Sequence, residues 1–112
     1  MKVIKALTKK PGQDPVEKIF RPNLKNIDKL IGGPMYTVKL LLKTGKKIVI
    51  IYPQDQPNEK YNFTICPTED KNHFIDINGN VIVCGRADDD RLIGVQLTED
   101  ELKELFRCPY EL

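Results

Sequence analysis

The sequence predicts an α+β fold, with a mostly antiparallel sheet of five to seven short strands and two helices. Short apolar runs recur along the chain and are joined by hairpin-length turns, which favours antiparallel pairing. Two other segments carry apolar residues at helical spacing behind a capping residue. At 112 residues we expect a single domain over residues 1–112, with both helices covering one side of the sheet.

The first two predicted strands form a hairpin. Residues 1–8 place three apolar side chains among lysines, which indicates a short strand. The turn after it contains Pro11 and Gly12, because proline presets φ and glycine accepts a positive φ. Residues 16–20 then provide a second strand that can pair with the first.

A short amphipathic helix is predicted over residues 24–31. Asn23 is a favoured N-cap residue. Gly32 supplies a left-handed C-cap position, and Pro34 prevents the helix from continuing. One face of this helix carries the apolar residues Leu24, Ile27, Leu30 and Ile31.

The strongest strand signals are residues 36–42 and 47–52. The four residues between them contain Gly45, which predicts a tight hairpin turn with glycine at a positive φ. Apolar and polar residues alternate over residues 61–66, which predicts another strand.

A second hairpin is predicted around Asn78 and Gly79. These two residues separate the apolar segments 74–77 and 80–84, and both tolerate a positive φ. We therefore expect the two segments to pair across a type I′ turn.

The C-terminal part predicts an exposed loop over residues 85–91, an extended segment over residues 92–97 and then a helix. Thr98 and Glu101 form a capping box, in which each side chain satisfies the other residue's backbone N–H. The face of this helix that turns toward the core carries Leu102, Leu105 and Phe106.

Charge is distributed unevenly along the chain. Residues 1–56 carry 12 Lys and Arg against 4 Asp and Glu, whereas residues 57–112 carry 6 against 12. The net charge is only +2. Such asymmetry marks a charged partner surface if the halves stay apart, and it cancels if folding mixes them.

The residues that could support catalysis or metal binding are few. The cysteines are Cys66, Cys84 and Cys108, and the one histidine is His73. With an odd number of cysteines and no secretory segment, we expect reduced thiols in the cytoplasm. The chain contains no serine, which excludes a Ser–His–Asp triad. No metal, cofactor or catalytic residue is therefore predicted, and we expect no enzyme.

An acidic run lies at Asp88, Asp89 and Asp90. Carboxylates bind Ca²⁺ or Mg²⁺, but this run lacks the alternating spacing of a calcium loop, and Arg86 and Arg91 flank it. A solvated loop is the favoured interpretation.

A basic hairpin is the candidate nucleic-acid contact. Lysines neutralise phosphates and aromatic rings stack on bases. The competing interpretation is a solvated sheet edge on which lysines prevent unwanted strand pairing. The residues that form this candidate site are Lys39, Lys43, Lys46, Lys47, Tyr36 and Tyr52.

Three segments of the chain resemble the family called domain of unknown function 3846, found in phages and mobile elements of Gram-positive bacteria. In order and spacing they cover most of residues 16–107, whereas the middle region, residues 53–71, departs from the family pattern. The resemblance implies an α+β fold and a phage or mobile-element context, and it carries no catalytic residue. The segments are residues 24–33 with the strand pair 36–52, residues 79–85, and residues 97–102.

We therefore expect a small non-enzymatic binding protein of a phage or mobile element. It acts through a protein partner and modulates a host process or a defence system. The alternative is nucleic-acid or nucleotide binding through the basic hairpin, and a weaker third hypothesis is a Cys–His or carboxylate enzyme. No apolar stretch could span a membrane, since the longest are residues 40–42 and 48–52. A homodimer formed by pairing of strand edges is a further expectation.

Overall fold

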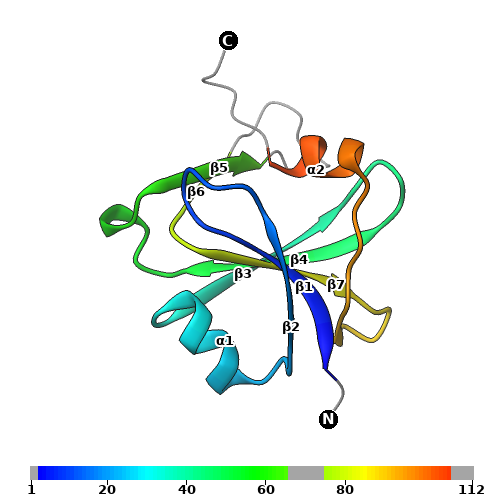
Figure 1. Ribbon diagram of the computed structural model, residues 1–112, viewed down its shortest axis with the longest axis horizontal. Helices are drawn as coiled ribbons and strands as arrows, with labels where there is room; N and C mark the ends of the chain where they lie inside the picture. Colours follow the sequence, from blue (N-terminus) through cyan, green and yellow to red (C-terminus); the bar gives the residue numbers. More distant parts are fainter. Residues whose placement is uncertain (1–2, 66–74, 107–112) are drawn as a thin grey trace.

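The computed structural model describes residues 3–65 and 75–106 (Figure 1). It confirms the predicted α+β class. The radius of gyration is 13.3 Å, close to the ~13 Å expected for one compact domain of this length. The elements in chain order are β1 (Ile4–Lys9), β2 (Val16–Phe20), α1 (Leu24–Ile31), β3 (Met35–Leu41), β4 (Lys47–Pro53), a 3-10 turn η1 (Gln56–Asn58), β5 (Tyr61–Ile65), β6 (Ile75–Asn78), β7 (Val81–Arg86), β8 (Leu92–Ile93) and α2 (Glu99–Leu105).

The main sheet is antiparallel and, over the described part of the chain, has six strands. Five of them follow the order β2-β1-β7-β4-β3, and β8 pairs with the end of β7. The predicted hairpins β1–β2 and β3–β4 are both confirmed by their registers. Strands β2 and β3 therefore form the two edges of this sheet.

The central strands β4 and β7 are buried on both faces. In β4, Ile48 and Ile50 pack on one side, whereas Val49 and Ile51 pack on the other. This follows from the alternation of side chains along a strand. The sheet consequently has two hydrophobic cores, and each of them needs its own cover.

The two helices cover opposite faces of the sheet, so the expectation that both lie on one side is wrong. Helix α1 buries Ile27 and Ile31 in the core that contains Val49. Helix α2 buries Leu105 in the other core, together with strands β5 and β6. Figure 1 shows α1 and α2 on either side of the central strands. The physical reason is that β4 and β7 are apolar on both faces.

The predicted hairpin across Asn78 and Gly79 is also wrong. Strand β6 pairs with β5 in a separate two-stranded sheet, whereas β7 pairs with β1 and β4. Gly79 has φ +87°, but Asn78 keeps the extended conformation of β6. The Gln56 side chain accepts from the Asn78 N–H at 2.8 Å and donates to its carbonyl at 3.0 Å. These bonds hold Asn78 in β6, so the Asn–Gly pair makes a corner between two sheets.

The helix ends form as predicted. The Asn23 side chain accepts from the backbone N–H of Asn26 at 2.9 Å, and Gly32 adopts φ +90°. The capping box between Thr98 and Glu101 is complete. Over the described residues, no helix is long and apolar enough to cross a membrane.

Candidate functional site

Tyr36 and Tyr52 lie directly opposite each other on β3 and β4. Their ring centroids are 5.9 Å apart and the rings are tilted by 59°. Tyr52 packs against the core that contains Leu40 and Leu105, and strand alternation puts Tyr36 on the same face. This pair lies at the end of the hairpin far from its turn.

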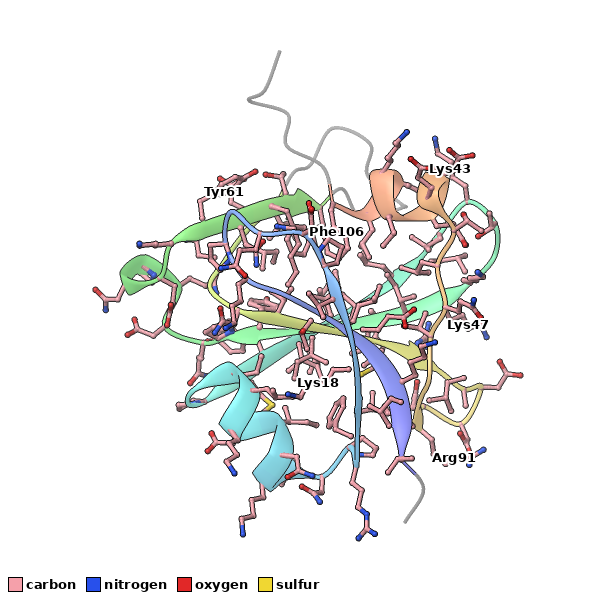
Figure 2. The ribbon with its side chains drawn as sticks, in the orientation of Figure 1. Lys18, Lys43, Lys47, Tyr61, Arg91 and Phe106 are labelled. Carbon is pink, nitrogen blue, oxygen red and sulfur yellow. The ribbon has the colours of Figure 1, made fainter. Side chains whose placement is uncertain are left out.

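Lys39 and Lys47 lie on the opposite face of the same two strands. Lys39 Nζ is 3.2 Å from Asp90 Oδ1, and Lys47 Nζ is 2.7 Å from Asp88 Oδ1. The hydrogen bond from Lys47 lowers the pKa of Asp88, and the hydrogen bonds from Lys39 and then Arg86 lower the pKa of Asp90. The acidic loop after β7 is thus the counter-charge for these two lysines. Figure 2 shows Lys47 and Arg91 on the same side of the molecule.

Lys46 belongs to a hydrogen-bond network around the buried Glu101 carboxylate, beside the hairpin turn. Its Nζ donates to Oε1 of Glu101 at 2.7 Å, and the Thr44 hydroxyl donates to Oε2 at 2.5 Å. The Glu101 carboxylate also accepts from the Thr98 N–H at 2.9 Å. These bonds, with that from Lys46 the largest, lower the pKa of Glu101 to about 2. The capping box was readable in the sequence, whereas the bond to Lys46 spans 55 residues and was missed.

Lys43 lies at the same turn and beside α2 (Figure 2). Its backbone N–H donates to Oε2 of Glu104 at 3.1 Å. The structure therefore splits the six predicted contact residues among three places. The tyrosines lie on one face, Lys39 and Lys47 on the other, and the remaining two lysines at the turn.

The fold mixes the basic and acidic halves of the chain. Among the described residues, three ion pairs join lysines of the first half to carboxylates of the second half, and all three lysines belong to the predicted hairpin contact. The charge asymmetry of the sequence is therefore reduced in space at the β3–β4 hairpin. A weaker positive field lowers the electrostatic contribution to nucleic-acid affinity.

Lys9 connects β1 to the small sheet. Its Nζ donates to Oδ1 of Asn62 at 2.6 Å and lies 5.9 Å from the ring centre of Phe63 and 5.8 Å from that of Phe106. Burial lowers the pKa of Lys9, an effect that Asp14 opposes. The Asn62 amide donates in return to the carbonyl of Lys9 at 2.9 Å. This arrangement ties the two sheets together.

Cys84 is fully buried, and burial raises the pKa of its thiol to about 12. A thiol in this state is a poor nucleophile. His73, Cys66 and Cys108 lie outside the described residues. Within the described ranges, no three His, Cys, Asp or Glu side chains are placed to hold a metal ion.

The outer strand β2 exposes apolar side chains on both of its faces. Val16 is 60% exposed and Ile19 is 68% exposed. Beside β2 lies a cleft of about 410 Å³, whose lining includes Val16, Lys18, Leu30 of α1 and Ile82 of β7. Sequence reasoning identified the strand and missed the site. The signal in the sequence was that Val16 and Ile19 point to opposite faces of a strand that was predicted to pair only with the first strand.

The fold and these features describe an α+β protein with an open, partly apolar sheet edge beside a cleft. No family model matches the chain, and neither a curated protein nor a solved structure matches it. The resemblance to the domain of unknown function 3846 family therefore stays a prediction.

Proposed function

We propose that this chain is a small non-enzymatic binding protein that acts through a protein partner, with strand β2 as the contact. The observation that carries the proposal is the exposure of Val16 and Ile19 on this edge strand. An edge strand presents backbone N–H and C=O groups to a partner chain. Apolar side chains exposed at such an edge add area that a partner can bury.

The biological setting of the proposal comes from the resemblance. A phage or mobile-element protein of this kind acts in the bacterial cytoplasm, where it modulates a host process or a defence system. Its partner is then a host or phage macromolecule. The lack of serine in the sequence and the inert, buried Cys84 thiol support a binding role over a nucleophilic one.

The test is a pull-down with the tagged full chain from host lysate, with and without nuclease. We expect one discrete protein to be retained after nuclease treatment. Ile19→Lys should abolish its retention, because a charge then replaces an exposed apolar side chain at the edge. Leu24→Lys is the matched control, since Leu24 is 78% exposed but lies on α1. If no protein is retained, or if both variants behave alike, the proposal is wrong.

Nucleic-acid binding through the β3–β4 hairpin is the alternative, and the same experiment decides it. Nuclease-sensitive material in the eluate would favour the alternative. Binding to oligonucleotides should then fall steeply with salt, because phosphate contacts release counterions. Lys43→Gln and Lys47→Gln should weaken such binding. We expect no salt-dependent binding, since carboxylates already lie against Lys39, Lys46 and Lys47.

A further inference from the structure

We propose that the β2 edge receives an extended peptide segment of the partner, which adds a strand to the sheet. The segment carries an apolar side chain opposite Val16, a carboxylate opposite Lys18 and a second apolar side chain opposite Ile19. This inference rests on the proposed function and deepens it, because it specifies the chemistry of the partner.

The backbone of β2 is suited to strand addition. Within the described residues, β2 pairs only with β1, so its outer edge has no strand partner. Pro15 immediately precedes the strand and Pro22 follows it closely. Proline has no N–H to donate to a sheet. The prolines therefore limit the site to a short segment, and the partner segment should be about as long as β2.

The two faces of β2 set the side chains that a partner strand should carry. Phe20 is buried in the core beneath α1, so Val16 and Lys18 face the same side by strand alternation. Ile19 faces the opposite side. Side chains directly opposite each other on neighbouring strands interact, and apolar pairs and opposite charges are favourable.

The cleft on the α1 side receives the residue opposite Val16. Helix α1 contacts β4 and β7, and the cleft lies between its Leu30 and the β1–β2 hairpin. Val16, Leu30 and Ile82 provide its apolar wall. Its volume of about 410 Å³ falls within the ~300–1,000 Å³ typical of ligand sites. An apolar side chain entering this cleft from the edge would bury the exposed part of Val16.

The charge around the cleft selects a carboxylate beside that apolar residue. The cleft is lined by three lysines, Lys9, Lys10 and Lys18, and by two carboxylates, Asp14 and Glu17, and Lys10 and Lys18 are exposed. In the part of the chain that the structure describes, Lys18 takes part in none of the ion pairs, whereas the neighbouring Glu17 is paired with Lys5 at 3.1 Å. A carboxylate opposite Lys18 therefore gains an attraction that no residue of the described chain supplies.

A second copy of this chain meets like charges at the edge in two of the symmetric registers. Two β2 strands paired antiparallel about a two-fold axis through their middle residue would place Lys18 opposite Lys18. Shifting the axis to Glu17 would place Glu17 opposite Glu17. Like charges directly opposite each other destabilise a strand pair. A register centred on Ile19 would instead place Ile19 opposite Ile19 and Glu17 opposite Arg21. A second copy is therefore the competing occupant, which light scattering separates from a peptide.

The experiment is selection of a random peptide library against the immobilised full chain, followed by affinity measurements on the enriched peptides. We expect the enriched peptides to share an acidic residue, which lies opposite Lys18. An apolar residue should follow next to it on the Ile19 side, and a second apolar residue should lie two positions away on the Val16 side. Lys18→Glu should weaken binding of such a peptide by ~10-fold. A second peptide, with lysine in place of the acidic residue, should bind the Lys18→Glu variant with most of the lost affinity restored. Lys25→Glu, on the exposed face of α1, is the control and should change affinity by less than twofold.

The remaining outcomes overturn the inference. The site is excluded if the selection enriches no sequence. It is also excluded if Lys18→Glu leaves the affinity of the enriched peptides unchanged while circular dichroism shows an intact fold. A dimer by light scattering that peptides cannot dissociate would assign the edge to a second copy. The proposed function fails separately, when the pull-down retains no protein. A retained partner that binds the Lys18→Glu variant equally well would contradict only the peptide inference.

Discussion

Lys46 Nζ lies 2.7 Å from Oε1 of Glu101, a side chain that is only 2% exposed. The pair joins the β3–β4 turn to the first turn of α2. Thr44 and Thr98 complete the hydrogen bonds of the carboxylate. A buried carboxylate that loses these partners would be costly, so this pair couples the position of the turn to that of the helix.

The first prediction concerns the pH dependence of stability. The folded pKa of Glu101 is about 2, below its usual value of 4.5. A lowered folded pKa contributes stability that is present above the usual value and is lost as pH falls toward the folded one. We therefore expect the free energy of unfolding to fall below about pH 4.5. Glu101→Gln should flatten this decline.

Urea unfolding at a series of pH values measures the effect. The lowered pKa values of Asp88, Asp89 and Asp90 act in the same direction, so some decline should persist in Glu101→Gln. Glu99→Gln is the matched control, because Glu99 is exposed at the start of the same helix. Parallel pH profiles for the wild type and Glu101→Gln would contradict the role of this carboxylate.

The second prediction concerns Asn62, which is 8% exposed and lies at an irregularity in strand β5. Its amide donates to the carbonyls of Lys9 and Gly79, at 2.9 and 2.7 Å. Asn62→Ala leaves these carbonyls and the Lys9 ammonium without their partner. We expect a loss of about 1–3 kcal/mol in the free energy of unfolding.

Chemical denaturation followed by circular dichroism measures that loss. Asn58→Ala is the control, since the Asn58 amide donates to the exposed carboxylate of Asp55, at 2.9 and 3.0 Å. It should change stability by less than about 0.5 kcal/mol. Equal effects of the two variants would show that Asn62 does not connect the sheets.

The third prediction compares two glycines with similar backbone angles. Gly45 has φ +92° with nothing near an added Cβ, so Gly45→Ala should cost about 1–2 kcal/mol from backbone strain alone. Gly79 has φ +87°, and a Cβ there would lie 2.7 Å from Cγ of Pro53. Gly79→Ala should therefore cost about 1–3 kcal/mol more. Thermal melting of the two variants tests the order, and a less stable Gly45→Ala variant would contradict it.

The fourth prediction concerns the reactivity of Cys84. Burial raises its pKa to about 12, so almost no thiolate exists at neutral pH. In a Cys66→Ala/Cys108→Ala variant, we expect alkylation of Cys84 only on unfolding. Its rate in urea should follow the unfolded fraction. Rapid alkylation of the native variant would instead revive the hypothesis of a cysteine-based enzyme.

The sequence by itself determined the local features of this fold. Asn23, Gly32, Gly45 and the Thr98–Glu101 box lie where predicted, because capping and tight turns depend on residues only a few positions apart. The apolar runs located most of the strands for a similar reason, since alternation is visible within each segment.

Only the tertiary structure decided which segments meet. Strand β6 pairs with β5 and not with β7, because Gln56 holds Asn78 in an extended conformation. The two helices divide between the faces because β4 and β7 are apolar on both sides. Three of the four lysines of the basic hairpin acquire carboxylate partners from the loop after β7 and from α2, far along the chain. Contacts between residues so distant in sequence leave no local pattern. The basic hairpin was therefore prominent in the sequence, because its lysines are close together, whereas the open β2 edge became visible only once the strand order was known.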